Sequence, residues 1–414
     1  MARGIEGYTG VEDAMVMVRN RLRPRLVAET VPTSDSFGRV SAADLTAPRA
    51  VPPFDISHMD GFAVRSDDIH DATEAVPASL KITGESRLGA ATRVASRQGG
   101  AVRVATGSRV PAGADTVVPI EHAKVEGGKI WVTSSQESGR WVYKTGADVG
   151  KRERVLAKGQ VIRAQQVGLL LGLGLTRVRV RKRPKVAVIA TGSELTDASA
   201  PKRGKIRNSH SPYFVSLIRA LGAVPVDMGI ARDELGEVGR TIRRALARSD
   251  FVLTLGGTSV GRADVVVEAI SSMGPDLMLH GLRMDRGRVA GIAVVGGKPV
   301  LMLPGPIQGA MNAFALFGVR LIDLMSGRDG GRQEVPCTLG TSWEARKRFA
   351  EFTKVVYVRV HAGEGMVAEP IAGETESIKV LCDADGYIVV PEAVTQIEKG
   401  SVVQVRLLPG FSFA

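Results

Sequence analysis

The sequence predicts a multidomain α/β plus β protein, with a central doubly wound parallel sheet, a small β-rich domain and a C-terminal β-barrel. Its 414 residues exceed the size at which one hydrophobic core keeps growing, so we expect two to four domains. Between residues 185 and 325, apolar strand patterns alternate with helical ones, which is typical of a doubly wound sheet. Residues 60–132 and 354–408 carry short strand patterns separated by turns, as in small barrels or sandwiches.

The composition is that of an ordinary globular protein. Hydrophobic residues make up 44% and charged residues 24% of the chain, which excludes collagen, a coiled coil and wholesale disorder. Residues 1–13 carry charges and glycines where a signal peptide needs an apolar core, and the longest unbroken apolar stretches are too short to span a bilayer. We therefore expect a cytoplasmic protein. Cys337 and Cys382 lack a metal-ligand spacing, so we interpret them as two buried free thiols.

The chain is basic, with 55 Lys and Arg against 43 acidic residues and a net charge of +12. A local basic run alternates with Val178 and Val180, as the solvated face of an amphipathic strand would. Aromatic residues make up only 5%, so base stacking and a nucleic-acid partner are the less favoured interpretation. We expect a general attraction for anionic substrates instead. The basic run consists of Arg177, Arg179, Arg181, Lys182, Arg183 and Lys185.

The first elements lead to a compact polar cluster. Apolar side chains in residues 12–28 recur with helical period, which predicts an N-terminal amphipathic helix. After Pro52 and Pro53, two carboxylates and a Ser-His pair lie within six positions, before a glycine that gives the backbone freedom. The cluster suits a metal or acid-base site, but spacing alone favours a capped turn in which Asp55 and Ser57 bond local amides. Its members are Asp55, Ser57, His58, Asp60 and Gly61.

The small β-rich domain contains a second polar loop. Thr106-Gly107-Ser108 is suited to presenting amides and hydroxyls to an oxyanion, and a purely structural loop explains it equally well. A connector over residues 141–158 contains Asp148, and residues 165–175 indicate a short apolar helix. The predicted strands around the loop are 78–82, 101–104, 116–119 and 129–132.

The α/β segment directs three loops to one edge. Buried-type strands end in loops at 191–195, 256–264 and 304–310. Because the carboxyl ends of parallel strands share one edge of a sheet, we expect these loops to converge on a ligand crevice. The predicted strands are 186–190, 223–228, 251–255 and 299–303, and the predicted helices are 212–221, 234–247, 265–273 and one ending near 325.

These loops carry the residues of a phosphate site. Glycines allow backbone amides to approach a phosphate, and a helix N-terminus after Gly261 adds partial positive charge. Glu194, Asp233 and Asp264 supply carboxylates at the same rim, which suits a magnesium ion that bridges phosphates, although they also suit helix caps. No loop ends in the Lys-Ser/Thr of a P-loop, which disfavours ordinary NTPase chemistry.

Four motifs in this order resemble the MoeA family of molybdopterin molybdenumtransferases, which is related to the C-terminal region of gephyrin. The first motif is highly specific to that family, and the resemblance runs through nearly all of the chain. The motifs are Pro53-Phe54-Asp55 with Met59-Asp60-Gly61-Phe62-Ala63-Val64, Thr106-Gly107 to Glu121, Ala190-Thr191-Gly192-Ser193-Glu194-Leu195, and Gly256-Gly257 to Asp264.

The resemblance implies Mg²⁺-dependent insertion of molybdate or tungstate into adenylylated molybdopterin, with release of AMP. It also implies a homodimer with a shared active site, a MogA-like central domain, and neither a membrane nor a nucleic-acid partner. The implied domains are an elongated connecting domain (28–46 and 153–184), a small β domain (47–152), a MogA-like domain (1–27 and 185–327) and a C-terminal barrel (332–414).

The resemblance further implies roles for single residues. We expect Asp60 to approach Asp264 from another domain or from the dimer partner. The implied catalytic residues are Asp60, Thr106, Glu194, Asp233 and Asp264, and the implied metal ligands are Glu194, Asp233, Asp264 and Asp148. The implied binding residues are Thr191, Gly192, Ser193, Gly256, Gly257, Ser259, Gly261, Arg286, Arg288, Pro304 and Gly305.

Two loops depart from the family pattern. A Met-Lys-Pro-Gly-Lys-Pro stretch is replaced by residues 284–289, where Asp285 stands for a lysine and Arg286 and Arg288 restore positive charge. A Leu-Pro-Gly-Asn-Pro-Val-Ser loop is replaced by residues 303–309, where Pro306 stands for the asparagine. The departures support an alternative function, a non-catalytic paralogue that binds a pterin or nucleotide or serves as a dimeric scaffold. A third hypothesis is a sugar- or nucleotide-phosphate transferase.

Overall fold

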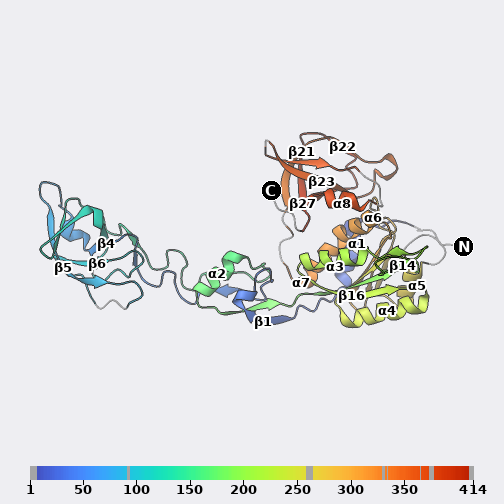
Figure 1. Ribbon diagram of the computed structural model, residues 1–414, viewed down its shortest axis with the longest axis horizontal. Helices are drawn as coiled ribbons and strands as arrows, with labels where there is room; N and C mark the ends of the chain where they lie inside the picture. The colour runs from blue at the N-terminus through green and yellow to red at the C-terminus, as the bar shows by residue number, and fades with distance from the viewer. Residues whose placement is uncertain are drawn as a thin grey trace.

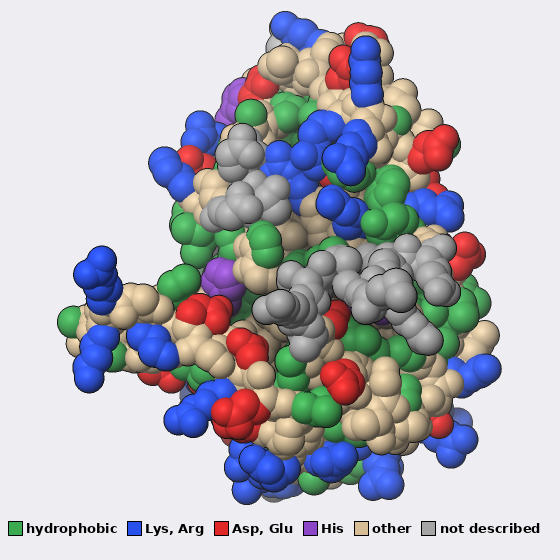
Figure 2. Space-filling model, turned by 90° about the vertical axis from the view of Figure 1, so that its right-hand side faces the viewer, with side chains coloured by type: hydrophobic (Ala, Val, Ile, Leu, Met, Phe, Trp, Pro, Cys, Tyr) green, Lys and Arg blue, Asp and Glu red, His purple; other side chains and the backbone are tan. Residues whose placement is uncertain are grey.

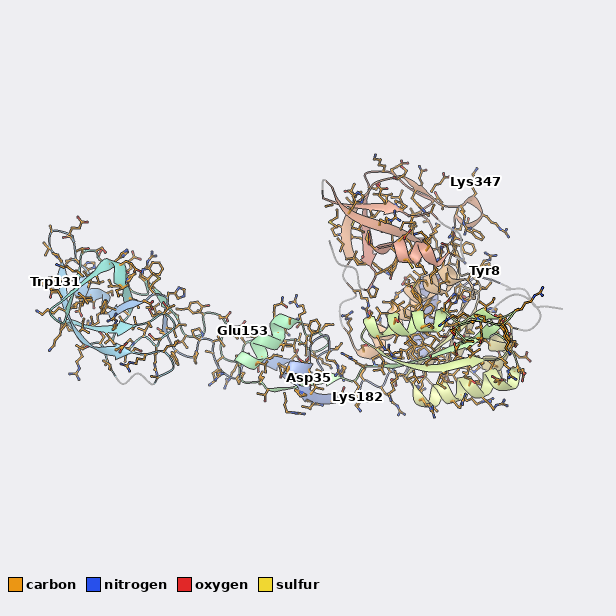
Figure 3. All side chains as sticks on the ribbon, in the orientation of Figure 1. Tyr8, Asp35, Trp131, Glu153, Lys182 and Lys347 are labelled. Carbon is orange, nitrogen blue, oxygen red and sulfur yellow. The ribbon has the colours of Figure 1, made fainter. Side chains whose placement is uncertain are left out.

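The computed structural model describes residues 7–90, 94–257, 264–328, 332, 334–363, 365–372 and 377–409. The molecule is elongated (Figure 1): the sheet that contains β4 (Gly61–Val64) lies at one end, and α2 (Ala164–Gly172) with β1 (Ala28–Pro32) lies in the middle. A larger α/β part and a C-terminal barrel lie together at the other end. The labelled side chains Trp131 and Lys347 mark the two ends in Figure 3.

The middle part is a narrow connector that the chain crosses twice. β1 pairs antiparallel with β12 (Arg177–Arg181), from Ala28 opposite Arg181 to Pro32 opposite Arg177. In β12, Val178 and Val180 are buried while Arg177 and Arg179 are exposed, so these two arginines of the basic run lie on the predicted solvated strand face. A second short pair joins β2 (Leu45–Thr46) to β11 (Arg154–Leu156).

The small β part is a six-stranded sheet in the order β7-β4-β6-β5-β9-β8. β4 lies between two partners and is buried along its whole length. Besides it, the sheet contains β5 (Ala78–Ser86), β6 (Gly100–Val104), β7 (Thr116–Pro119), β8 (Ala123–Glu126) and β9 (Lys129–Val132). A separate pair, β3 (Ile56–Ser57) with β10 (Val142–Tyr143), brings the Asp55 stretch against the segment 141–158.

The α/β part is built on a six-stranded sheet in the order β16-β13-β17-β20-β19-β18. Its first four strands are parallel, and the last two form an antiparallel edge that the sequence did not indicate. The parallel strands are β13 (Lys185–Thr191), β16 (Val224–Ala231), β17 (Phe251–Leu255) and β20 (Lys298–Leu303). The edge strands are β18 (Leu277–His280) and β19 (Gly291–Val295).

Helices cover both faces of this sheet, as a doubly wound fold requires. One apolar core lies between the sheet and α4 (Leu235–Arg248) with α5 (Val265–Ser271). The other lies under α1 (Val11–Arg21), α3 (His210–Ala220) and the long helical run that follows β20, and it continues into the C-terminal part through Tyr357 and Tyr387.

The long helical run consists of α6 (Ile307–Ala313), a π-helical stretch (Phe314–Gly318) and α7 (Val319–Ser326). Its 20 residues have the length and composition of a membrane-crossing helix, but 72% of the apolar window is buried inside the fold. Gly318 lies against the Phe314 ring, where an added Cβ would stand 2.4 Å from a ring carbon. The run is therefore a core helix in this structure.

The C-terminal part contains a closed barrel in the order β21-β24-β23-β25-β27, and this confirms the predicted fold class. α8 (Ile378–Asp383) packs against α6, so the barrel and the α/β part are in contact. Cys337 is buried in the barrel, whereas Cys382 is exposed, so the expectation of two buried thiols is wrong for Cys382. The barrel strands are β21 (Glu334–Leu339), β23 (Lys354–Gly363), β24 (Gly365–Pro370), β25 (Gly386–Val390) and β27 (Val402–Leu407).

Candidate functional site

The loops that follow the parallel strands meet at one edge of the α/β sheet. The Gly256 amide, after β17, donates to the Leu303 carbonyl at the end of β20 over 2.9 Å. The Thr191 hydroxyl, at the end of β13, donates to the Leu255 carbonyl over 3.2 Å. The expected convergence holds for the described parts of these loops. Ser259 and Gly261 lie outside the described residues.

Gly256 and Gly257 allow this edge to close. Both have positive φ, +93° and +70°. An added Cβ on Gly256 would stand 2.8 Å from the Thr191 carbonyl oxygen, and one on Gly257 would stand 2.6 Å from a Val266 methyl carbon. The two glycines thus fit between the end of β13 and the first turn of α5, where a larger residue is excluded.

Glu194 and Asp233 lie exposed on the rim of this edge. The Ser193 amide donates to Asp233 Oδ2 over 2.9 Å, and the Asp233 amide donates to the Ser193 hydroxyl over 3.2 Å. This reciprocal pair fixes the loop after β13 to the loop after β16. The Glu194 carboxylate folds back over Gly192, where an added Cβ would stand 2.6 Å from Glu194 Oε1.

Asp264 is partly a helix cap and partly unsatisfied. Its Oδ1 accepts from the Val267 amide over 3.0 Å, so the capping interpretation holds for this oxygen. Its Oδ2 is buried and lies 3.3 Å from His280 Nε2, a charge contact without hydrogen-bond geometry, so both atoms lack a hydrogen-bond partner in the described part of the chain. Burial raises the pKa of the Asp264 carboxyl. This oxygen is available to a further ligand.

The carboxylates at this edge do not form a closed metal site with the other described residues. Among the described residues, no three His, Cys, Asp or Glu side chains gather closely enough to hold an ion. Asp148 lies in the segment between β10 and β11, away from the strand-end loops. The exposed Glu194 and Asp233 and the free Asp264 oxygen are the type of donor that Mg²⁺ prefers, but a complete shell requires oxygens from elsewhere.

Asp60 and Thr106 contact each other at the opposite end of the molecule. The Thr106 amide and hydroxyl both donate to Asp60 Oδ1, over 2.7 Å and 3.2 Å. Asp60 immediately precedes β4, whose sheet is far from the α/β sheet (Figure 1). Asp60 therefore does not meet Asp264 within one chain.

The oxyanion interpretation of the Thr106 loop does not hold for its amides. The Gly107 amide donates to the Ser57 carbonyl over 2.7 Å, and the Ser108 amide donates to the Ala105 carbonyl over 2.9 Å. Because the Thr106 amide is held by Asp60, all three amides have internal partners. Within one chain, the amides of this loop therefore brace the Asp60 turn.

The Asp55 stretch is a turn, but its bonds differ from the expected pattern. Ser57 does bond locally, because its hydroxyl donates to the Met59 carbonyl over 2.6 Å. Asp55 instead accepts from the Thr145 amide and hydroxyl, both at 2.8 Å, and from Lys144 Nζ at 3.0 Å. The expectation of local amide bonds is therefore wrong for Asp55, which joins the turn to Lys144 and Thr145.

This tie predicts a pH-dependent contribution to stability. Burial opposes ionisation of Asp55, but the bonds from Thr145 and Lys144 outweigh it and lower the pKa of the carboxyl. Since the pKa is lower in the folded state, the stabilisation is present above the unfolded-state pKa and is lost as pH falls through the folded-state pKa. We expect Asp55→Asn to unfold at lower denaturant concentration than the natural protein at pH 7, with the gap closing on acidification. A gap that is constant with pH would contradict this cause.

The two departing loops connect the α/β part to the C-terminal part. Asp285 forms an ion pair with Arg346, which precedes β23. The Asp285 amide donates to the Thr353 carbonyl over 2.8 Å. Arg286 Nη1 donates to the Gln308 side chain over 2.5 Å, and Gln308 Nε2 donates to the Ser377 carbonyl over 3.1 Å. The aspartate and the glutamine thus have partners across the contact between the two parts.

A cavity of about 430 Å³ lies beside these contacts. At the wall of the cavity, the Tyr357 hydroxyl donates to the Asn312 side chain over 2.8 Å. Burial raises the pKa of Tyr357 well above its usual value. Arg288 stacks over the Phe349 ring at 5.2 Å. Lys and Arg side chains gather on the upper half of the face in Figure 2. The lining includes Asp285, Arg286, Gln308, Asn312, Trp343, Arg346, Lys354 and Tyr357.

Sequence reasoning missed the barrel's contribution to this cavity. Arg346 and Asp285 are 61 positions apart, and neither Lys354 nor Tyr357 belongs to a motif with a ligand-binding spacing. The Arg286 loop touches the first turn of α6, which follows Gly305, since an added Cβ on Gly287 would stand 2.8 Å from the Gly309 carbonyl oxygen. The segment 303–309 therefore joins the crevice to the cavity, because the Leu303 carbonyl accepts from Gly256 and Gln308 lines the cavity.

The Asp285–Arg346 pair predicts the effect of restoring the family's lysine. We expect Asp285→Lys to lower stability by about 1–2 kcal/mol, because it places a cation between Arg286 and Arg346. The double exchange Asp285→Lys with Arg346→Glu should recover part of the loss in urea unfolding. Simple additivity of the two single changes would show that the pair does not couple.

The fold and this edge define a class: a multidomain α/β plus β protein with a ligand crevice at the carboxyl ends of a parallel sheet. Three family descriptions match in order, "MoeA N-terminal region (domain I and II)" at residues 9–174, "Probable molybdopterin binding domain" at 187–323, and "MoeA C-terminal region (domain IV)" at 336–408.

Similar proteins cover nearly the whole chain. A Bacillus subtilis protein named molybdopterin molybdenumtransferase is 32% identical over 92% of this chain and 90% of its own. Molybdopterin molybdenumtransferase 2 of Mycobacterium tuberculosis is 31% identical over 91% of this chain and 94% of its own. The crystal structure of the molybdopterin biosynthesis MoeA protein of Pyrococcus horikoshii, 27% identical, superposes with a TM-score of 0.85 over 97% of this chain and 100% of that one. The chain belongs to the MoeA family of molybdopterin molybdenumtransferases, a family of enzymes, and the resemblance stated from the motifs is confirmed.

Proposed function

We propose that this protein acts in molybdenum cofactor biosynthesis and inserts molybdate or tungstate into adenylylated molybdopterin, with release of AMP. One observation carries the proposal: in a MoeA-family chain, the segment 303–309 joins the strand-end crevice to the 430 Å³ cavity. A substrate with a phosphate-rich nucleotide end and a pterin end requires two adjoining subsites of this kind.

The strand-end loops would bind the phosphates. Thr191 ends β13 and is followed by Gly192 and Ser193, and Gly256 and Gly257 follow β17, so both loops face the same edge. Pro304 and Gly305 are proposed to border the second subsite because they precede Gln308, which lines the cavity. Arg286, also in the lining, and Arg288, which stacks on Phe349, would be its cations. Ser259 and Gly261 are proposed to complete the phosphate loop.

We propose that Glu194, Asp233 and Asp264 hold Mg²⁺ together with substrate oxygens. When bound, the ion would neutralise charge on the phosphates and polarise the bond that is cleaved. The unsatisfied Oδ2 of Asp264 supports this assignment, and the exposed Glu194 carboxylate can approach an ion, whereas the Asp233 carboxylate already accepts from the Ser193 amide. Glu194 would therefore adjust on binding, while Asp233 and Asp264 are each held by a backbone amide.

We further propose a homodimer in which Asp60, Thr106 and Asp148 come from the second copy. Within one chain the Asp60 turn is at the far end of the molecule from the crevice (Figure 1), so a role for it requires another subunit. The narrow connector, which we propose as a domain of residues 28–46 and 153–184, would place the small β domain of one copy over the crevice of the other. We propose a cytoplasmic location for this dimer.

The test is insertion by the purified natural protein. Adenylylated molybdopterin, molybdate and Mg²⁺ are supplied, AMP release is followed, and the product is scored by reconstitution of an apo-molybdoenzyme. AMP release together with reconstitution supports the proposal, and their absence under conditions where a MoeA relative is active rejects it.

The departing loops favour one alternative, a non-catalytic paralogue. Its motivation is the Asp285–Arg346 pair, which sets a carboxylate at the edge of the cavity. Calorimetric titration with molybdopterin and with AMP distinguishes the cases: binding without turnover favours a binding paralogue, and no binding favours a scaffold. Turnover of ordinary nucleotides without a pterin would instead favour the phosphate-transferase hypothesis.

A further inference from the structure

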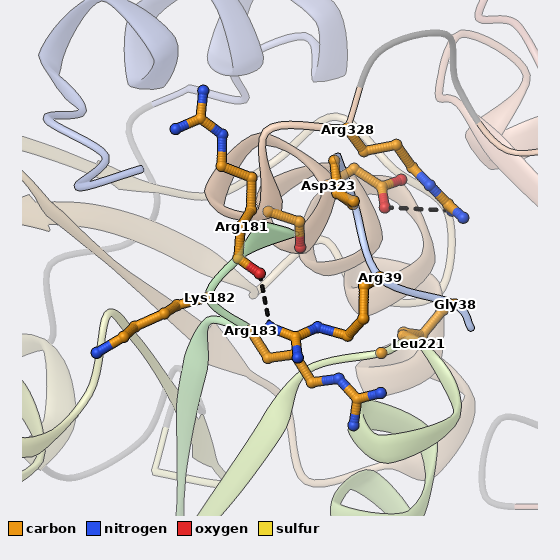
Figure 4. A pocket seen from close by; sticks show the side chains of 11 residues that line it. Gly38, Arg39, Arg181, Lys182, Arg183, Leu221, Asp323 and Arg328 are labelled. Atoms are coloured by element: carbon orange, nitrogen blue, oxygen red, sulfur yellow. Dashed lines mark hydrogen bonds and ion pairs between the residues drawn. The ribbon is translucent and has the colours of Figure 1, made fainter. Parts of the chain in front are cut away.

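A second, strongly basic pocket lies where the connector joins the α/β part, next to the start of β13, whereas the strand-end loops follow the end of β13. It is about 30 Å³ in volume and is bounded by four segments (Figure 4). Residues 38–40 and 181–183 come from the connector and its exit, Leu221 and Gly222 follow α3, and residues 323–328 end α7. The pocket is therefore built by the joint itself.

Two arginines inside the joint are incompletely satisfied. The Arg39 side chain is only 10% exposed, and its Nη2 donates to the Arg181 carbonyl over 2.8 Å and pairs with Glu29. Arg181 Nη1 donates to the Leu26 carbonyl over 2.7 Å. In both residues Nε is buried without a hydrogen-bond partner in the described part of the chain. A buried N–H donor without an acceptor is costly, so an additional acceptor here would stabilise the joint.

The carboxylate that lines the pocket already pairs with two arginines. Asp323, the one carboxylate among its lining residues, accepts from Arg332 Nη2 over 2.8 Å and lies 3.6 Å from Arg328 Nη1. Burial and the neighbouring Arg332 lower the pKa of the Arg328 guanidinium, the direction expected where like charges crowd together.

The rim of the pocket adds two more cations. Lys182 and Arg183 are exposed, and their side chains make no hydrogen bond or ion pair with the other described residues. Arg39, Arg181 and Arg328 also line the pocket, and the carboxylates beside these five cations are Asp323 in the lining and Glu29, which pairs with Arg39. The pocket thus has a clear excess of positive charge that only a ligand or solvent ions can offset.

We propose that this joint pocket binds a small tetrahedral oxyanion of the phosphate or sulfate class. A nucleotide or a pterin is too large for a cavity of 30 Å³, which accommodates a small ion or one to two water molecules. The excess of cations selects an anion over water, and the buried Nε–H groups of Arg39 and Arg181 are two unpaired donors in the pocket wall among the described residues. Because the lining comes from both sides of the joint, the anion holds the connector at one angle to the α/β part. The proposal does not depend on the proposed function.

The test is calorimetric titration of the full-length natural protein with sulfate and with inorganic phosphate, at constant ionic strength set by chloride. We expect saturable binding of at least one anion and a higher Tm in its presence than in chloride alone. Equal Tm values in sulfate, phosphate and chloride, without saturable heat, would overturn the proposal. Neither anion is the substrate of the insertion reaction, so this failure would leave the proposed function untouched.

Variants separate this pocket from the phosphate-binding loops. Lys182→Glu with Arg183→Glu should weaken anion binding by about tenfold or more, because both rim cations become repulsive. The matched control is Lys129→Glu with Lys151→Glu, which makes the same charge change at exposed positions outside the pocket. Equal weakening by both pairs, or no weakening by the rim pair, would overturn the assignment to the joint. Arg39→Lys, which keeps the charge and removes Nε–H, should also weaken binding without abolishing folding.

Discussion

Asp264→Ala is expected to lower the rate of molybdenum insertion by about 10²-fold or more, the largest catalytic effect in this account. Asp264 is the one rim carboxylate that is both fixed by a cap and left with an unsatisfied buried oxygen. Removing it takes away a preorganised negative group where a cation would be held. Its loss cannot be compensated by Glu194 or Asp233, whose side chains are exposed.

The experiment must separate this role from helix capping. Loss of a cap costs only about 1 kcal/mol, and Asp264→Asn keeps an acceptor for the Val267 amide. We therefore expect Asp264→Asn to fold like the natural protein and still lose insertion. Asp227→Ala, an exposed carboxylate within β16, is the matched control and should retain the natural rate. Full activity of Asp264→Asn would contradict the proposed role.

Gly61→Ala is expected to destabilise the small β part by about 3 kcal/mol or more. An added Cβ on Gly61 would stand 2.1 Å from the Val118 carbonyl oxygen and 3.0 Å from the Ile120 amide. Both are backbone atoms of the neighbouring segment, so they cannot rotate away as a flexible side chain would. Because β4 is paired on both sides, the clash cannot be relieved at a free edge.

Urea unfolding measures this effect, with Gly168→Ala as the control. Gly168 lies in α2 with no heavy atom within 4 Å of an added Cβ, so alanine there should be neutral or slightly stabilising. Equal midpoints for Gly61→Ala and the natural protein would show that the sheet adjusts by moving β7. Such a result would remove the steric explanation for this glycine.

Gly61 illustrates what a pattern can and cannot reveal. The sequence placed a glycine beside Asp60 and suggested a need for unusual backbone angles. The φ angle of Gly61 is not positive, so backbone angles do not explain the glycine. A side chain is excluded because β7, which pairs with β4, comes within 2.1 Å of where a Cβ would stand. A need for unusual backbone angles can be predicted from neighbouring residues. The close packing at Gly61 cannot, because it depends on Val118, more than fifty positions away.

The same distinction explains the site. The convergence of the loops after Thr191, Leu255 and Leu303 was predictable, because parallel strands place their carboxyl ends on one edge whatever lies between them. The antiparallel edge strands β18 and β19 were not predicted, although residues 277–279 and 292–295 are apolar, because a run of three or four apolar residues neither separates strand from helix nor gives a strand's direction. The Asp285–Arg346 contact was not predictable either, since it depends on how the barrel packs on the α/β part.

The central claim is that one active site combines the Asp264 crevice of one subunit with the Asp60 turn of another. Mixing subunits tests it most directly. Asp60→Ala and Asp264→Ala proteins should each be inactive, and co-expression should yield mixed dimers with one intact site. With random pairing we expect about a quarter of the natural insertion activity. Activity no higher than that of either variant alone would contradict a site shared between subunits.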